Sequence, residues 1–196
     1  AEALRVNFVG ELGWELHHPI EMQNYIFDQV MEAGTEFDIK PFGIRAMDSM
    51  RLEKSYRLIP REMSIEYSAF ESGLDRFVRL DKEDDFIGKA ALEAWQKRGS
   101  DNGFVTMEVL GVVDADARGS EAIYKDGEVV GRGTSGGYGW RCSKSLALGL
   151  LRVDLAEIGT EREMEILGKK YQAIVIEESP FDPKHECLRS EHNKFP

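Results

Sequence analysis

The chain has 196 residues, of which 42% are hydrophobic, and it can therefore build one large domain or a medium domain with a small one. Lysine and arginine total 25 against 36 aspartate and glutamate residues, giving a net charge of −11. Such a surface repels phosphate backbones and anionic lipid, so neither nucleic acid nor a membrane is expected as a partner. Apolar runs such as 146–151 fall far short of the roughly 20 residues that a membrane-spanning helix needs.

The first half of the chain predicts a hairpin and three helices. Two short strands within residues 4–18 meet at a glycine-bounded turn over 10–13. A helix is expected from about Pro19 to Gly34, and a second from about Phe42 to Lys54 with Ile44, Met47 and Met50 facing inward. A third helix is expected from an N-cap at Asp85 to Gly99.

The second half predicts strands. β-Branched and apolar residues dominate 104–110, 123–130, 146–153, 163–166 and 171–176, and Asp126-Gly127 is a strong signal for a two-residue hairpin turn. We therefore predict an α+β part followed by a small antiparallel barrel or sandwich. The expected division is 1–102, then 103–180, then a polar tail over 181–196.

The stretch from Gly131 to Gly136 matches G-x-G-x-x-G after a strand, but two further glycines follow within three residues, where a dinucleotide site needs a helix. A bulged strand or a binding loop is the favoured interpretation. The histidines and the cysteines Cys142 and Cys187 lack the paired spacing of a structural metal site, so no metal is expected. No serine or cysteine lies in a nucleophile-elbow context, which disfavours covalent catalysis and leaves the catalytic residues unknown.

Glu15 is the strongest candidate among the acidic residues for binding a ligand. Strand alternation places Glu15 and His17 on one face and Trp14 and Leu16 on the other. If the first face meets solvent, Glu15 is an ordinary surface carboxylate. If that face lines a cavity, its two oxygens can accept paired N–H donors from a heterocycle such as a pterin. The same ambiguity applies to the charges of the second helix, Arg45, Arg51 and Glu53. Asp48 and Arg51 lie three residues apart and can simply form an ion pair on the face of the helix.

Four ordered motifs carry a family resemblance: Phe8-Val-Gly-Glu-Leu-Gly-Trp-Glu15, the run from Phe42 to Tyr56, Glu71-Ser-Gly-Leu-Asp, and Asp85-Phe-Ile-Gly-Lys89. In order and spacing they resemble the tetrahydrofolate-binding aminomethyltransferase family. That family includes the glycine cleavage T-protein and the C-terminal regions of dimethylglycine and sarcosine dehydrogenases, and the dimethylglycine dehydrogenase branch is the most similar. The resemblance implies the second half of a folate-binding domain followed by a small antiparallel β-barrel.

For the site, the resemblance implies that Glu15 anchors the pterin of tetrahydrofolate. Phe8 stands where a tyrosine is usual, so it keeps a ring and lacks the hydroxyl. Arg45 lies two residues before the position of the family's usual arginine, here Met47, and could reach the folate from its own position.

The resemblance further implies that an N-methyl amine such as dimethylglycine or sarcosine is oxidised at FAD in an upstream domain, and that tetrahydrofolate captures the carbon as 5,10-methylenetetrahydrofolate. The family's assisting aspartate and its flavin domain precede the matched region, so the chain is expected to be a fragment without a complete catalytic centre. A glycine cleavage T-protein and a non-catalytic folate-binding remnant remain alternatives. The expected compartment is the cytoplasm in a bacterium and the mitochondrial matrix in a eukaryote.

Overall fold

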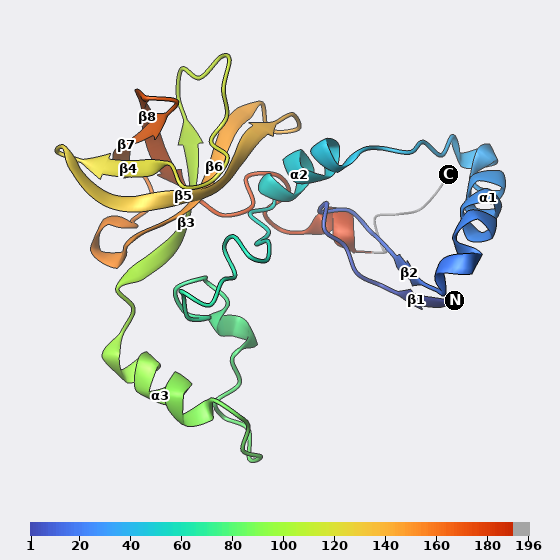
Figure 1. The fold of residues 1–196 in the computed structure, drawn as a ribbon, viewed down its shortest axis with the longest axis horizontal. Coiled ribbons are helices and arrows are strands. Elements are labelled where there is room, and N and C mark those ends of the chain that lie inside the picture. The colour runs from blue at the N-terminus through green and yellow to red at the C-terminus, as the bar shows by residue number, and fades with distance from the viewer. Residues whose placement is uncertain (190–196) are drawn as a thin grey trace.

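A computed structural model describes residues 1–189 and shows a β-barrel joined to an extended N-terminal region (Figure 1). The N-terminal region contains a two-stranded antiparallel sheet and two helices, and a third helix precedes the barrel. Their bounds are β1 Glu2–Leu4, β2 Glu15–His17, α1 Gln23–Ala33, α2 Ile44–Leu52 and α3 Lys89–Arg98. The predicted hairpin is confirmed, with Leu4 opposite Glu15, although its strands are shorter and its loop longer than expected.

Six antiparallel strands close into the barrel in the order β3-β6-β5-β4-β7-β8, with β8 pairing back to β3. The strands are β3 Asn102–Val109, β4 Ala122–Lys125, β5 Glu128–Gly139, β6 Lys144–Arg152, β7 Glu161–Ile166 and β8 Lys169–Ile176. The mixed α+β class and the barrel are therefore confirmed. Asp126 and Gly127 join β4 to β5 with φ of 51° and 84°, the left-handed pair that a tight hairpin turn requires.

Alternate residues of the strands fill the barrel. Val105, Met107 and Val109 of β3 point inward beside Met164 and Ile166 of β7, because successive side chains of a strand point to opposite faces. On the outer face of β6, Leu146 and Leu148 pack against Leu52. This second apolar cluster attaches the end of α2 to the barrel wall.

The glycines from Gly131 to Gly136 lie inside β5, whose pairing with β6 shifts register between Gly133 and Ser135. A β-carbon at Gly131 would lie 2.3 Å from the carbonyl oxygen of Leu150. The bulged-strand interpretation is thus confirmed, and no helix follows to form a dinucleotide site.

Two local predictions about helices were wrong. The N-cap of α3 is Gly88, and Asp85 instead accepts a hydrogen bond from the amide of Phe86 at 2.9 Å. Of the three residues expected to face inward on α2, Ile44 is 75% exposed and Met47 and Met50 are half-buried, while the fully buried positions are Arg51 and Leu52. The apolar periodicity misled because the charged end of the helix finds partners: Arg51 pairs with Asp48 and lies 3.6 Å from Glu62, and Glu53, just after the helix, pairs with Arg141 of the barrel.

The domain boundaries stay a prediction, as does the assignment of residues 181–196 to a separate tail. Phe181 donates its amide to the carbonyl of Glu53 at 3.1 Å, so the start of this tail packs against the segment after α2. The remainder, 190–196, lies outside the described residues. Within 1–189, no helix combines the length and the apolar composition that crossing a bilayer requires.

Candidate functional site

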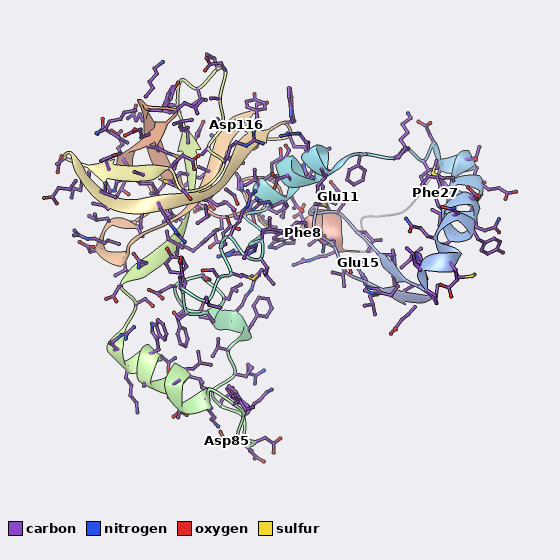
Figure 2. The ribbon with its side chains drawn as sticks, viewed as in Figure 1. Phe8, Glu11, Glu15, Phe27, Asp85 and Asp116 are labelled. Atoms are coloured by element: carbon purple, nitrogen blue, oxygen red, sulfur yellow. The ribbon has the colours of Figure 1, made fainter. Side chains whose placement is uncertain are left out.

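The candidate site is built on residues Phe8 to Gly13, which belong to the loop that joins β1 to β2. This loop contacts the region around α2 (Figure 2). The ring of Phe8 stacks against Tyr56, with centroids 6.3 Å apart and planes at 26°. Burial raises the pKa of Tyr56, as expected for a phenol that is partly removed from water. Phe8 therefore holds the start of the loop against the segment that follows α2.

Gly10 makes the tight turn of this loop. Its φ is +79°, and a β-carbon there would lie 2.5 Å from Cγ of Lys54. Both the left-handed backbone and the close approach of the lysine chain require glycine at this position. Nζ of Lys54 donates to the carbonyl oxygens of Phe181 and Asp182 at 3.0 and 2.6 Å, and burial lowers the pKa of Lys54.

The two glutamates of the Gly-Glu-x-Gly-x-Glu motif occupy different environments. Oε1 of Glu11 lies 2.9 Å from Nη1 of Arg141, in an ion pair with the barrel. Glu15 lies on β2 with 55% of its side chain exposed, and its Oε2 is 3.3 Å from Nε2 of His17, which is equally exposed. Glu11 is thus committed to a structural contact, whereas the carboxylate of Glu15 can exchange a weak solvent-exposed partner for a ligand.

Arg45 lies in the first turn of α2 and is exposed. In the described part of the chain, no hydrogen bond or ion pair joins Arg45 to Glu15 or to Phe8. Phe8 and Glu15 are linked through the loop that they bracket. They share a segment because they are neighbours in the sequence. Among the described contacts the ring of Phe8 meets Tyr56 and the carboxylate of Glu15 meets His17, so no contact joins the three predicted ligand residues to one another. Their roles toward a ligand stay a prediction.

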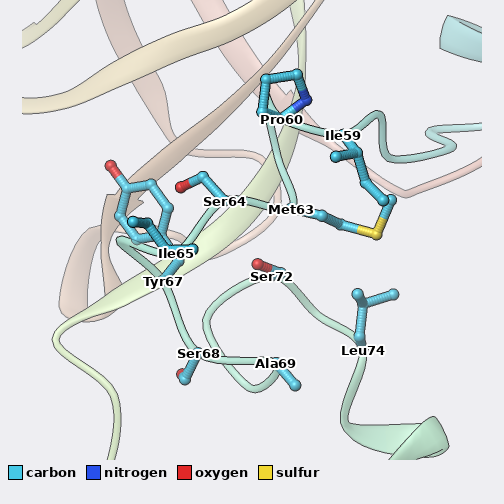
Figure 3. Close-up of a pocket in the computed structure, with 10 residues that line it drawn as sticks. All are labelled: Ile59, Pro60, Met63, Ser64, Ile65, Tyr67, Ser68, Ala69, Ser72 and Leu74. Carbon is cyan, nitrogen blue, oxygen red and sulfur yellow. The ribbon is translucent and has the colours of Figure 1, made fainter.

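A cavity of about 610 Å³ lies elsewhere, in the long connection between α2 and α3 (Figure 3). Its lining is mostly apolar and consists of Ile59, Pro60, Met63, Ser64, Ile65, Tyr67, Ser68, Ala69, Ser72 and Leu74. The hydroxyls of Ser68 and Ser72 already bond to Glu71 and to the carbonyl of Glu62, at 3.1 and 2.8 Å. None of the predicted ligand residues lines this cavity.

A buried charged network, which no sequence pattern had indicated, lies between α2 and the barrel. Glu62 is fully buried, accepts hydrogen bonds of 2.6 Å from the hydroxyls of Thr134 and Ser135, and accepts one of 2.8 Å from the amide of Leu58. Arg51 lies 3.6 Å from Glu62 and donates to Asp48 at 2.7 Å, the ion pair anticipated from their spacing. These charges join the elements and are not open to a ligand.

No group of three or more metal-ligating side chains is clustered within residues 1–189. Both cysteines are free thiols, and burial raises the pKa of Cys142. A raised pKa lowers the thiolate fraction at neutral pH, which argues against Cys142 as a nucleophile.

Two family models match the chain. The GCVT N-terminal domain matches residues 1–82, and the glycine cleavage T-protein C-terminal barrel domain matches residues 103–182. Together they account for most of the chain, in the order of the α+β part and the barrel.

Among curated relatives, mitochondrial dimethylglycine dehydrogenase of Homo sapiens is 43% identical over 176 residues, covering 90% of this chain and 20% of the relative. Mitochondrial sarcosine dehydrogenase of Mus musculus is 33% identical over 195 residues, covering 95% of this chain and 21% of the relative. An aminomethyltransferase of Desulfitobacterium hafniense is 33% identical over 174 residues, covering 88% of this chain and 46% of the relative. The chain thus spans about a fifth of the dehydrogenases and less than half of the aminomethyltransferase.

A solved structure shares the fold. The glycine cleavage system aminomethyltransferase T from Bartonella henselae superposes with a TM-score of 0.80 at 23% identity, over 91% of this chain and 49% of that protein.

Proposed function

The chain belongs to the glycine cleavage T-protein family, and from that membership we propose that it binds tetrahydrofolate as the aminomethyltransferase-type part of an N-methyl amine dehydrogenase. The amine would be dimethylglycine or sarcosine, and the one-carbon unit would leave as 5,10-methylenetetrahydrofolate. The higher identity to dimethylglycine dehydrogenase than to the aminomethyltransferase, 43% against 33%, favours this over a glycine cleavage T-protein.

The exposed carboxylate of Glu15 is the observation that carries the proposal. A pterin presents neighbouring N–H donors, and a carboxylate can accept both at once. Glu11, the other glutamate of the motif, is held by Arg141, so Glu15 is the one left to bind. Phe8 and Trp14 flank this stretch and offer ring surfaces to a flat heterocycle, while Arg45 offers a cation to a ligand carboxylate.

The task of these residues would be orientation. Tetrahydrofolate supplies the nitrogen that accepts the one-carbon unit, and a fixed pterin replaces a bimolecular encounter by an intramolecular one. No residue of the described chain is assigned a proton-transfer role, so the catalytic residues stay open.

FAD does not fit the residues present. The glycine-rich stretch 131–136 is an interior part of β5 that contacts neighbouring backbone, and the element that follows it is strand β6, where a dinucleotide site needs a helix N-terminus. We propose that the flavin of such a dehydrogenase is bound by an upstream domain of a longer chain, as the share of the dehydrogenases outside the match allows.

The compartment follows from the relatives. The mammalian dehydrogenases are named as mitochondrial, so we propose the mitochondrial matrix if the source is a eukaryote and the cytoplasm if it is a bacterium.

The test is a calorimetric titration of tetrahydrofolate into the chain and into Glu15→Gln. The amide keeps one acceptor oxygen and turns an N–H toward a pterin donor, which costs about 1.5–3 kcal/mol and raises Kd roughly 10- to 150-fold.

The matched control is Glu2→Gln, on the paired strand opposite His17 and likewise exposed. We expect it to change Kd less than about twofold, because surface substitutions stay within about 0.5 kcal/mol. Equal Kd values for the two variants would remove Glu15 from the site.

A further inference from the structure

We propose that Arg141, in the turn between β5 and β6, is a positioning residue that holds the Phe8–Gly13 loop and so sets the place of Glu15. This inference rests on the proposed function for its meaning, but the contact itself can be tested without any ligand.

Arg141 reaches the loop through both terminal nitrogens of its guanidinium. Nη1 pairs with Glu11 at 2.9 Å, and Nη2 donates to the carbonyl oxygen of Val9 at 3.0 Å. Nη2 also donates to the carbonyl of Met50 near the end of α2 at 3.1 Å. One side chain of the barrel therefore fixes the loop by a side-chain and a main-chain contact and ties both to the helix.

The other side of Arg141 is fixed just as firmly. The Nε atom of Arg141 pairs with Oε2 of Glu53, whose side chain is 1% exposed. The backbone amide of Arg141 donates to Oε1 of Glu53 at 2.5 Å. The guanidinium carbon lies 3.8 Å from the ring centroid of Phe181. Because these partners hold the planar group in one orientation, the nitrogens that face the loop are preorganised.

Glu15 follows Glu11 by four residues, beyond the second glycine of the motif. The remaining contacts of the loop described above are the stacking of Phe8 on Tyr56 and the packing of Gly10 on Lys54, and both precede Glu11. Glu15 is held within the hairpin by its pairing with Leu4. Among the described contacts that join the loop to the rest of the molecule, the Arg141 ion pair with Glu11 is the nearest to Glu15 along the chain. If this ion pair opens, the attachment of the hairpin to the barrel loses its link nearest to Glu15, so the position of the carboxylate becomes less restricted.

Truncating Arg141 would leave the buried Glu53 carboxylate unpaired and could unfold the chain. The loop-side variant Glu11→Ala avoids this, since Glu11 is 46% exposed and Glu53 keeps its arginine. Glu11→Gln serves as a conservative rescue, because its amide oxygen can still accept from Nη1.

The chain offers a matched control in Glu178→Ala. Glu178 is 49% exposed and pairs with Arg57 at 2.6 Å, an arginine that also stacks 3.7 Å from the ring centroid of Phe104 and makes no contact with the loop. The two alanine variants therefore remove similar ion pairs from a similar setting, and only one of them touches the Phe8–Gly13 loop.

The experiment measures hydrogen exchange of the amides of residues 7–13 and, in parallel, Kd for tetrahydrofolate by calorimetry. We expect Glu11→Ala to speed exchange in the loop and to raise Kd about threefold to tenfold, with Glu11→Gln close to wild type and Glu178→Ala unchanged in both.

Unchanged loop exchange in Glu11→Ala would overturn the inference, as would an equal rise of Kd in Glu178→Ala. If the wild-type chain binds no tetrahydrofolate, the proposed function fails, and the exchange rates still decide whether Arg141 holds the loop.

Discussion

At the scale of single residues, Glu62 shows how much the interior depends on one carboxylate. It lies between Arg51 and two hydroxyls of β5, and none of these groups has access to bulk water. A buried charge is tolerated only when its partners are complete, so each partner is constrained by the others.

We expect Glu62→Gln to lower the free energy of unfolding by about 2–4 kcal/mol, because the amide removes the charge that balances Arg51 and loses an acceptor. Glu66→Gln, four residues on and 60% exposed in its pair with Arg132, should cost less than about 1 kcal/mol. Urea unfolding of both variants gives the comparison, and similar losses would show that Glu62 is not the critical partner.

Single residues also mark the limit of prediction from sequence. The family motifs identified Glu15 and Phe8 as candidates, and the structure places Phe8 on the loop against Tyr56 and Glu15 at the start of β2. The burial of Arg51 and Lys54 could not be foreseen, because the groups that cover them include distant ones: Glu62 lies 3.6 Å from Arg51, and Lys54 donates to the carbonyls of Phe181 and Asp182. A run of charges at the end of a helix usually indicates a solvated face, and here tertiary contacts reverse that expectation.

At the scale of elements, local patterns were sufficient for most strands. The β-branched runs and the Asp126-Gly127 turn predicted the strands, since hairpins depend on short-range turn chemistry. The exact ends were less accessible: β5 continues to Gly139 through a glycine-rich stretch that local propensity would not extend. Closure into a barrel rather than a sandwich depends on the pairing of β3 with β8, which are more than 60 residues apart.

The glycines of β5 give a test at this scale. A β-carbon at Gly136 would lie 2.5 Å from the carbonyl oxygen of Ala117, whereas one at Gly103 in β3 would meet its nearest neighbour at 3.6 Å. We expect Gly136→Ala to destabilise the chain by about 1–3 kcal/mol through overpacking. Gly103→Ala should stay within about 1 kcal/mol of wild type.

Thermal or urea unfolding of the two glycine variants distinguishes these outcomes. Equal stability of Gly136→Ala and Gly103→Ala would mean that β5 can move away from residue 117 without cost.

At the scale of the whole molecule, the barrel and the hairpin are joined through a small number of side chains. The hairpin and α1 extend away from the barrel in Figure 1, and α1 contains no buried residue. Arg141 and Lys54 connect the loop to the barrel side of the molecule, and Arg5 donates to the carbonyl of Leu188 at 3.1 Å. The position of Glu15 therefore depends on a few polar links rather than on a large apolar core.

This arrangement also explains why the cavity between α2 and α3 is not assigned to tetrahydrofolate. Its serines at 68 and 72 are already bonded within the connection, and the family motif points to the hairpin loop instead. A pterin bound at the hairpin loop and a pterin bound in the cavity would lie at different positions, and a structure of the complex distinguishes the two.

The most direct test is a crystal structure of the chain grown with tetrahydrofolate. We expect the pterin to lie against the Phe8–Glu15 segment, with both carboxylate oxygens of Glu15 at about 2.7–3.1 Å from its N–H donors. A pterin bound in the cavity lined by residues 59–74, or anywhere that leaves Glu15 paired with His17 alone, would contradict this expectation.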